Sequence, residues 1–451
     1  MKKLFSILIV AALTAALAVT AVGCKSTGGN DDSNSAGNYG KDIPGGVGDV
    51  SAETLQALSQ SGTVSVYQFG ESDEEDEAFE DYFSEVYGGT LDKRNIVWEG
   101  WEAQFITQFA AGDAPDVIYL YSKLWPRAAS RGLVYSKADL EQLGIAALDH
   151  PVITNSAELA SNNFTYAGNV YAMDVYLVTP NVMLVNDTLL KDCGVEKTPT
   201  QYYQDGQWNW DSFLKVMAQV CSIDNDADGK PDYRGYNGWD PTYVLSGNDG
   251  YLIKYDDNGK LFANTSDTKV INGLQMYNDV ISKNYCIERG SFQDGKTATY
   301  VETHYNVAKR IYNEGNELGF DWSVVPYPLG PDNETGSMPG GCEAYAVVSS
   351  TQNPQGAINY IIAKSAFKSQ YVEEKPDYDL EYWLDDEGDQ MLNDLRLKIH
   401  ERTWNGVGNV WSTQWDFWNA ARNTKSVSEL LSAWGPWMEA QCEVENSYSA
   451  N

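Results

Sequence analysis

Apolar and polar residues alternate along the chain in blocks that are typical of strands and helices. Short apolar runs at 63–69, 95–98 and 116–120 predict buried strands, and the bulky residues of 78–86 and 101–109 recur at the spacing of one helical face. Strand, helix and strand in this order predict parallel pairing. Ligands bind at the carboxyl ends of such strands, near which the sequence places Gly70, Glu71, Tyr119 and Tyr121.

Eight of the eleven residues from Glu71 to Asp81 are acidic. They lie in the first turns of the helix predicted over 78–86 and in the residues just before it, where the helix dipole favours negative charge. A binding site for a metal ion or a cationic ligand is the alternative interpretation of this cluster.

The N-terminus predicts export. Two lysines precede an uncharged run from residue 4 to residue 22 that ends in small residues, so residues 1–23 are predicted to be a signal peptide. A transmembrane helix is the weaker alternative, because a polar tract follows without the basic cluster of a stop-transfer sequence. The Val-Gly-Cys ending resembles the lipobox of bacterial lipoproteins. This resemblance implies that Cys24 carries fatty chains such as palmitate and anchors the protein.

Residues 24–61 are rich in Gly, Ser, Asn and Asp, and they predict a flexible tether behind the lipid anchor. A flexible chain of this length spans on the order of 35 Å, which would hold a folded body clear of the membrane. The expected location is therefore extracytoplasmic, with the protein lipid-anchored to the bacterial cell membrane.

Charge and cysteine spacing exclude several classes of function. The 451 residues include 31 Lys and Arg against 64 Asp and Glu, which gives a formal net charge of −33. Nucleic-acid binding is excluded because phosphate backbones are held by clustered cations. The five cysteines after Cys24 form no CxxC pair, which excludes a zinc ribbon or a thioredoxin motif and leaves one disulfide open.

Six segments carry motifs that occur together in one order. The most specific is Phe109-Ala-Ala-Gly-Asp-Ala-Pro-Asp-Val117. The others are 168–174 with 181–187, 208–213, 292–298, 324–331, and 340–348 with 354–361. In this order they resemble the extracellular solute-binding proteins of family 1, the sugar-binding components of ABC importers that include maltose-binding protein. The resemblance covers roughly residues 63–363.

The resemblance implies an α/β fold of the two-lobed periplasmic-binding-protein type, class II, with hinge strands between the lobes and the ligand in the cleft. The implied N-lobe spans 62–176 plus 303–350, and the implied C-lobe spans 177–302 plus 351–451. Hinge crossings are expected near 174–180, 298–305 and 349–352. In such proteins the ligand stabilises the closed state through contacts to both sides.

The resemblance also implies the function. The protein would capture a carbohydrate, either a mono- or an oligosaccharide, and deliver it to the permease subunits of an ABC importer. We expect it to act as a monomer, without an organic cofactor and without catalysis.

The aromatic content agrees with a carbohydrate ligand. The chain has 14 Trp and 29 Tyr, and the flat faces of sugars stack on aromatic rings while carboxylates accept hydrogen bonds from hydroxyls. The candidate contacts are Glu71, Tyr121, Tyr176, Trp239, His304, Tyr305, Glu343 and Trp411. The alternative for each aromatic is core packing, which is strongest for Trp411, Trp415 and Trp418 at the i, i+4, i+7 spacing of a buried helical face.

A short acidic loop resembles an EF-hand calcium loop. Asp224, Asp226 and Asp228 occupy its positions 1, 3 and 5, and Gly229 follows at position 6 for the tight turn. The Lys230 carbonyl at position 7 and Asp232 at position 9 complete the candidate ligands, while position 12 is Gly235 rather than the usual Glu. Structural calcium is therefore expected to bind weakly, and a solvated turn is the alternative.

Three other classes compete with a sugar importer. A secreted glycosidase also needs aromatics and paired carboxylates. A His-based catalytic triad or a catalytic zinc site is disfavoured, because the chain has only three widely spaced histidines, His150, His304 and His400. No HExxH motif or nucleophile elbow occurs either. A cell-surface scaffold would need a duplicated acidic loop. A binding protein for a peptide or another non-sugar solute remains open.

Overall fold

The computed structural model describes residues 56–238, 241–287, 292–312, 318–371, 379–400, 407, 410–424 and 426–449. The predicted signal peptide, Cys24 and most of the tether lie outside these residues. The described chain forms two compact units, and strands β6 (Asp174–Asn186) and β13 (Gly340–Val347) pass from one unit into the other. No helix in this part of the chain is long and apolar enough to cross a membrane.

Unit 1 takes the described residues of 1–120, 132–176 and 343–372. Strands β1 (Gly62–Phe69), β2 (Gly89–Ile96) and β3 (Val117–Leu120) pair in parallel, in the order β2-β1-β3, as the strand-helix-strand pattern predicts. Strand β13 joins β3 antiparallel. The other elements are α3 (Glu74–Tyr87), α4 (Trp101–Ala111), α6 (Lys137–Gln142), α7 (Pro151–Asn155), α8 (Ala157–Asn163), α15 (Pro354–Tyr371), β4 (Thr165–Tyr166) and β5 (Asn169–Val170).

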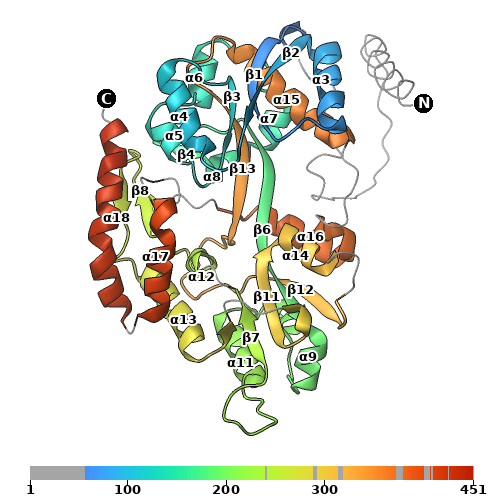
Figure 1. Cartoon of the computed structure of the whole chain (residues 1–451), viewed down its shortest axis with the longest axis vertical. Helices are drawn as coiled ribbons and strands as arrows, with labels where there is room; N and C mark the ends of the chain where they lie inside the picture. Colours follow the sequence, from blue (N-terminus) through green and yellow to red (C-terminus); the bar gives the residue numbers. More distant parts are fainter. Residues whose placement is uncertain are drawn as a thin grey trace, which may run out of the picture. The chain divides into compact units, whose positions relative to one another are not determined.

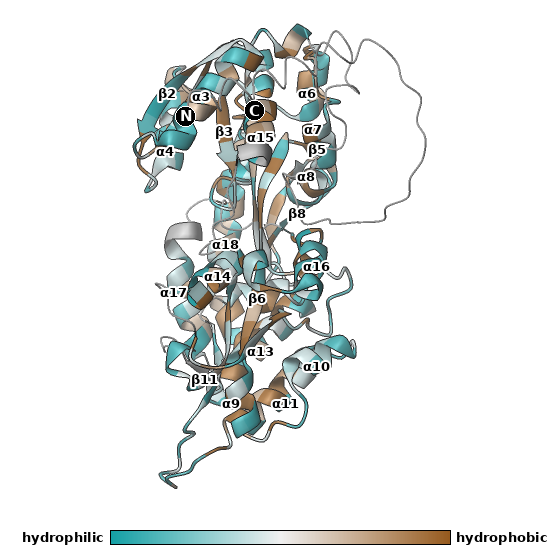
Figure 2. Ribbon diagram, turned by 90° about the vertical axis from the view of Figure 1, so that its right-hand side faces the viewer, coloured by the Kyte–Doolittle hydropathy of each residue, from teal (hydrophilic) through white to brown (hydrophobic). Residues whose placement is uncertain are grey.

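Helices cover both faces of the unit 1 sheet (Figure 1). Val66 faces the core beneath α3 and α15, where Phe79 and Phe83 are at most 2% exposed. The next residue, Tyr67, points to the other face and packs on Trp101 of α4 at 5.9 Å between ring centroids. Each fully buried Phe contributes about 1.5–3 kcal/mol of stability. The edge strand β2 is largely hydrophilic (Figure 2), which discourages pairing with further strands.

Helix α3 shows why acidic residues crowd its start. Asp73 is the N-cap, and its side chain and that of Asp76 each accept the other residue's backbone N–H in a capping box. Glu74 and Glu75 also lie in the first turn, as the dipole argument predicts. Gly88 ends the helix at φ 58°, and a Cβ there would come within 2.3 Å of the Ser59 carbonyl oxygen.

Unit 2 takes the described residues of 121–131, 177–342 and 373–451. Its strands β10 (Cys286–Ile287), β7 (Arg234–Asn237) and β11 (Thr297–Thr303) are parallel, and β11 and β12 (Trp322–Pro326) both pair antiparallel with β6. A hairpin is formed by β8 (Ile253–Tyr255) and β9 (Leu261–Ala263).

The helices of unit 2 are α5 (Arg127–Ser130), α9 (Asp187–Asp192), α10 (Pro199–Gln204), α11 (Trp210–Val220), α12 (Thr242–Ser246), α13 (Thr268–Ser282), α14 (His304–Tyr312), α16 (Asp386–Arg396), α17 (Val410–Asn423) and α18 (Val427–Ser449), with short 3₁₀ turns η2 (Phe292–Asp294) and η4 (Leu380–Trp383). Asn209 caps α11, and its side chain accepts the backbone N–H of Ser212 at 3.1 Å. This helix start coincides with the motif at 208–213.

The unit boundaries correct the expected division of the chain. The first crossing falls after Tyr176, but residues 303–342 lie in unit 2 and residues 351–371 lie in unit 1. The physical reason is packing. Strands β11 and β12 both bond to β6 inside unit 2, and α15 buries Ile361 in the core of unit 1. The expected hinge at 298–305 is therefore wrong, because β11 runs directly into α14 within unit 2.

A buried carboxylate ties the C-terminal helix to an earlier segment of unit 2. Glu445 on α18 is fully buried and accepts two bonds from the Arg131 guanidinium, at 2.7 and 2.9 Å, and one from the Ser130 hydroxyl at 2.9 Å. The same guanidinium stacks on the ring of Tyr448 at 3.9 Å. Bidentate bonds of this kind combine charge with fixed geometry.

Replacing Glu445 by Ala is expected to lower the stability of unit 2 by about 3 kcal/mol, because the Arg131 side chain, which is 18% exposed, would stay largely desolvated without its carboxylate. The midpoint of urea unfolding, followed by tryptophan fluorescence, measures the loss. Glu443→Ala, at an exposed position on the same helix, is the matched control and should change stability by no more than about 0.5 kcal/mol. Equal midpoints for the two variants would contradict the role of this ion pair.

Candidate functional site

The carboxyl ends of β1, β2 and β3 meet at one edge of the unit 1 sheet. Phe69 ends β1, Trp98 follows the end of β2, and Tyr119 lies in β3. The Trp98 side chain is 45% exposed, and the other two are half-buried. The ring centroid of Phe69 lies 5.0 Å from that of Trp98 and 5.7 Å from that of Tyr119. Partly exposed aromatic rings thus gather where parallel sheets bind ligands.

Two tyrosines of β6 and β13 pack against these rings: Tyr176 is half-buried, and Tyr345 is only 2% exposed and supports the others from the core. The rings of Tyr176 and Tyr345 are stacked, with centroids 4.4 Å apart and planes inclined by 29°. Tyr119 lies 5.9 Å from Tyr176 and 5.4 Å from Tyr345. Ring contacts of this kind contribute about 0.5–1.5 kcal/mol beyond burial, so they hold a preformed surface. We call these residues the aromatic cluster: Phe69, Trp98, Trp101, Tyr119, Tyr176 and Tyr345.

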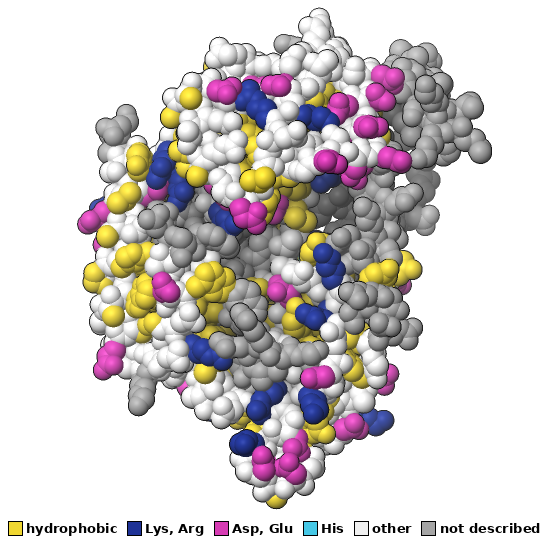
Figure 3. All heavy atoms as spheres, in the orientation of Figure 1, with side chains coloured by type: hydrophobic (Ala, Val, Ile, Leu, Met, Phe, Trp, Pro, Cys, Tyr) yellow, Lys and Arg dark blue, Asp and Glu magenta, His cyan; other side chains and the backbone are white. Residues whose placement is uncertain are grey.

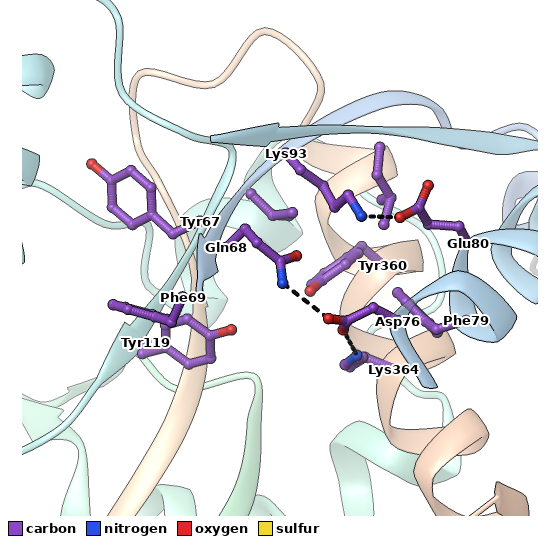
Figure 4. A pocket seen from close by; sticks show the side chains of 12 residues that line it. Tyr67, Gln68, Phe69, Asp76, Phe79, Glu80, Lys93, Tyr119, Tyr360 and Lys364 are labelled. Carbon is purple, nitrogen blue, oxygen red and sulfur yellow. Dashed lines mark hydrogen bonds and ion pairs between the residues drawn. The ribbon is translucent and has the colours of Figure 1, made fainter. Parts of the chain in front are cut away.

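A pocket of about 180 Å³ lies beside the aromatic cluster, among β1, β2, α3 and α15 (Figure 4). Gln68, Asp76 and Lys364 point toward one another in it. The Gln68 amide donates to the Asp76 carboxylate at 2.9 Å, and the Lys364 ammonium lies 3.9 Å from that carboxylate. Small-molecule pockets usually enclose about 300–1,000 Å³, so this one has room for part of a ligand.

The charged groups that line this pocket compensate each other in pairs. Lys93 forms an ion pair with Glu80 and donates to the Ser72 hydroxyl at 2.6 Å. Lys364 faces Asp76, and burial together with the nearby Lys368 lowers the pKa of Lys364. The pocket therefore offers both donors and acceptors without a surplus of either charge among its lining residues.

A second polar group lies at the β6 and β13 end of the aromatic cluster. The Tyr176 hydroxyl donates to the Glu343 carboxylate at 2.5 Å, and both side chains are half-buried. Burial raises the pKa of Glu343 and, with the negative charge of Glu343, that of Tyr176. The Lys368 ammonium lies 5.0 Å from the Tyr176 ring centroid, and burial lowers its pKa. In such partly desolvated surroundings a polar ligand group interacts more strongly than in water.

Asp174 lies two residues before Tyr176 on β6 and is only 3% exposed. Its carboxylate accepts a hydrogen bond from the Ser156 hydroxyl at 2.7 Å. Burial raises the pKa of Asp174 to about 6, although its hydrogen bonds and Lys368 oppose the shift. This carboxyl group is therefore a buried charge at neutral pH.

A family model described as bacterial extracellular solute-binding protein matches residues 77–381, which is more than half of the chain. The chain belongs to the bacterial extracellular solute-binding proteins. This match confirms the family expected from the sequence motifs and implies an extracytoplasmic location for this solute-binding protein. No curated protein sequence matches the chain closely enough to count as a relative.

Solved structures show the same two-lobed α/β fold. UspC of M. tuberculosis has a TM-score of 0.60 at 14% identity, over 84% of this chain and 100% of its own. The sugar-binding protein MalE of Xanthomonas citri has a TM-score of 0.57 at 16% identity, and the match covers 85% of this chain and 98% of MalE. UgpB of Mycobacterium tuberculosis, in complex with glycerophosphocholine, has a TM-score of 0.56 at 15% identity, and the match covers 86% of this chain and 100% of UgpB. At these identities the likeness establishes the fold, as predicted.

Three of the predicted contact residues of this solute-binding protein lie in unit 1. Tyr176 and Glu343 are brought together by their hydrogen bond, and Glu71 is exposed in the loop between β1 and α3. Tyr121 lies in unit 2 and is 7% exposed. Trp239 and the side chain of Trp411 lie outside the described residues.

The remaining two candidates begin helix α14 in unit 2. His304 is 7% exposed, and burial lowers its pKa to about 4, so its imidazole is neutral at pH 7. Tyr305 is 37% exposed, and its hydroxyl accepts a hydrogen bond from the Lys309 ammonium at 2.9 Å. Tyr305 is thus accessible to a ligand, whereas His304 lies inside the unit.

The tryptophan spacing on α17 does not mark a uniformly buried face. Trp418 is 4% exposed, as core packing requires, but Trp415 is 41% exposed. The i, i+4, i+7 rule assigns both to one side of the helix. The packing of neighbouring elements covers only the part of that side that bears Trp418.

The acidic loop between α11 and β7 gathers part of the predicted calcium ligands. Carboxylate oxygens of Asp224, Asp226 and Asp232 lie within 4.8 Å of one another, and acidic side chains cluster on this loop in Figure 3. The backbone N–H of Gly229, at φ 82°, donates to Asp224 at 2.9 Å. The Asp228 carboxylate lies 3.6 Å from the Lys230 ammonium instead of joining the other three.

Several residues of the site were not among the sequence candidates, and Trp98, Asp76, Lys364 and Lys368 are four of them. The sequence pattern assigns Trp98 to the end of a buried strand, although a Trp that directly precedes a Glu-Gly turn is a signal for exposure. Asp76 is indistinguishable from its acidic neighbours in the sequence. The two lysines lie on α15, within the residues 351–451 that the family resemblance assigns to the C-lobe.

Replacing Asp174 by Asn is expected to stabilise unit 1 at pH 7.5. The pKa of Asp174 is about 6 in the folded protein and 3.8 ordinarily, so the folded state binds the proton more readily and its stability falls as the pH rises from about 4 to about 6. Asparagine retains the acceptor for Ser156 and removes the charge, which should yield a gain on the order of 2 kcal/mol.

Thermal unfolding at pH 7.5 and pH 4 measures this gain, which should shrink at pH 4 because Asp174 is then protonated in the folded protein. Asp81→Asn on α3, at an exposed position, is the control and should shift the midpoint little at either pH. A D174N midpoint below that of the unaltered protein at pH 7.5 would show that the charge is stabilising.

Proposed function

We propose that this solute-binding protein captures a carbohydrate, either a mono- or an oligosaccharide, and delivers it to the permease subunits of an ABC importer. The observation that carries the proposal is the partly exposed edge of the aromatic cluster beside paired polar groups. Trp98, Phe69 and Tyr119 offer ring surface for the C–H faces of a sugar. Glu343 and the Asp76 pocket offer acceptors and donors for its hydroxyls.

The ligands of the structural neighbours bear on this choice. MalE of Xanthomonas citri is a sugar-binding protein, whereas UgpB of Mycobacterium tuberculosis was solved with glycerophosphocholine. The fold therefore accepts more than one class of solute. Aromatic rings stack on the C–H faces of a sugar, and they also bind quaternary ammonium groups such as that of choline. The Glu343 carboxylate beside the aromatic cluster favours the neutral carbohydrate, because the phosphate of glycerophosphocholine would approach a like charge there.

The anchor and mode of action are part of the same proposal. The Val-Gly-Cys sequence at Cys24 supports a lipid anchor, with residues 24–61 as the tether to the folded body. The protein acts as a monomer, binds its solute without cleaving it, and works at the outer face of the cell membrane. Its family consists of binding proteins, which supports binding rather than hydrolysis.

Isothermal titration of the mature protein tests the ligand class. The panel is glucose, galactose, mannose, xylose, maltotriose, cellotriose and mannotriose, with glycerophosphocholine as the non-sugar comparison. At least one sugar should bind saturably, and Trp98→Ala should weaken it roughly tenfold through the loss of stacking. Trp415→Ala, which removes a similarly exposed Trp of unit 2, is the matched control. Binding of glycerophosphocholine alone would refute the carbohydrate, and release of monosaccharide from the trisaccharides would indicate a hydrolase.

We also propose that the loop of residues 224–232 binds a structural calcium ion. Calcium takes six to eight oxygen ligands, and three carboxylates with oxygens within 4.8 Å of one another fit part of such a shell. The Lys230 carbonyl and water would supply others. The pairing of Asp228 with Lys230 and the Gly at position 12 support weak binding.

Calcium should raise the thermal midpoint of EDTA-treated protein, by an amount that corresponds to about 2.7 kcal/mol at a hundredfold excess over Kd. Asp224→Asn should abolish the response, because Asp224 supplies one of the three converging carboxylates and also accepts the backbone N–H of Gly229 within the loop. Asp257→Asn, at an exposed acidic position in another turn, should retain it. An unchanged midpoint in the unaltered protein would favour a solvated turn.

A further inference from the structure

Lys368 stands apart from the other lysines of the site. Lys93 and Lys364 each face a carboxylate partner, Glu80 and Asp76. Within the described part of the chain, the Lys368 ammonium makes no hydrogen bond or ion pair, and it lies 5.0 Å from the centroid of the Tyr176 ring. The side chain is still partly exposed. An ammonium has three donors, and leaving them unused in partly desolvated surroundings costs free energy.

Charged groups on three elements face this ammonium. Glu343 on β13 and Asp174 on β6 favour its charge, as does Glu75 on α3, while burial opposes the charge. Lys364, one helical turn earlier on α15, is the neighbouring cation. Burial outweighs the three carboxylates and lowers the pKa of Lys368, and none of these carboxylates takes up its hydrogen bonds.

Glu343 has the complementary property. Its carboxylate accepts one bond, from the Tyr176 hydroxyl, and a carboxylate has about four acceptor sites. The Glu343 residue is half-buried. Both groups contact Tyr176: the Lys368 ammonium lies 5.0 Å from the centroid of its ring, and the Glu343 carboxylate accepts a hydrogen bond from its hydroxyl. Stacking on Tyr345 fixes that ring, which makes Tyr176 a positioning residue.

We propose that Lys368 and Glu343 together bind two adjacent hydroxyl groups of the solute. The Lys368 ammonium donates to the oxygen of one hydroxyl, and the Glu343 carboxylate accepts the proton of its neighbour. This inference rests on the proposed carbohydrate function and narrows it to saccharides with a free vicinal diol at the bound residue. Lys368 is then a specificity-determining contact.

The charges around the site favour a diol over an ion. An anionic ligand such as a phosphate would satisfy Lys368 but would approach Glu343 and Asp174, and a cationic ligand would meet Lys364 and Lys368. In both cases the charge of the ligand would lie next to a like charge of the site in partly desolvated surroundings, which costs free energy. A neutral diol supplies a donor and an acceptor at once and adds no net charge.

Titration calorimetry with the tightest-binding sugar of the panel above tests the proposal. Lys368→Met and Glu343→Gln should each weaken binding roughly 10- to 100-fold, the range for a hydrogen bond to a charged group. Lys137→Met, which removes a partly exposed lysine of α6 in the same unit, should leave the affinity within twofold. Circular dichroism and the thermal midpoint establish that each variant is folded.

Monodeoxy analogues of the same sugar identify the hydroxyls. If Lys368 binds a given hydroxyl, the analogue without it should bind weakly to the unaltered protein, and Lys368→Met should cost little further affinity for that analogue. Equal affinities of K368M and K137M for the parent sugar would overturn the diol contact and leave the carbohydrate function intact. Failure of every sugar to bind the unaltered protein would overturn both.

Discussion

The parallel pairing of β1 with β2 and β3 is the constraint on which the unit 1 site depends. The ladder runs in register from Gly62 opposite Gly89 to Phe69 opposite Ile96, so the carboxyl ends of these strands reach the same edge. Phe69 and Trp98 meet there only because their strands run in the same direction. An antiparallel partner would have carried Trp98 to the far end of the sheet. The helices that cover both faces leave this edge as the place where aromatic rings stay partly exposed.

The second constraint is electrostatic. The chain has a net charge of −33, yet three lysines, Lys93, Lys364 and Lys368, lie within one small region of unit 1. Ion pairs to Glu80 and Asp76 compensate two of them. Burial raises the pKa of Asp174 to about 6 and lowers that of Lys368, so the site retains charges that unfolding would relieve. Partly desolvated polar groups of this kind lower stability and strengthen interactions with a polar ligand.

Much of the local structure followed from sequence patterns. The apolar runs located β1 and β3, and the acidic stretch before Phe79 located the first turn of α3. The site was only partly predictable. Tyr119, Tyr176 and Glu343 lie in it, but Tyr176 and Glu343 are 167 residues apart in the chain, and nothing local indicates that they bond. Trp98 was missed because the apolar run assigned it to a buried strand, although the Glu-Gly turn that follows it is a signal for exposure.

The sequence by itself determined the type of the elements around β1 and β3 and the parallel direction of these strands, since periodicity and turn residues act within a few positions, and its ordered motifs determined the family. Tertiary structure alone decided which sheet α15 covers and therefore where Lys364 and Lys368 lie. An apolar helix can pack on either unit with similar local energy, so the choice depends on the shape of the core that accepts Ile361 and Tyr360. The same long-range packing decided that β11 and β12 belong with β6 and not with unit 1.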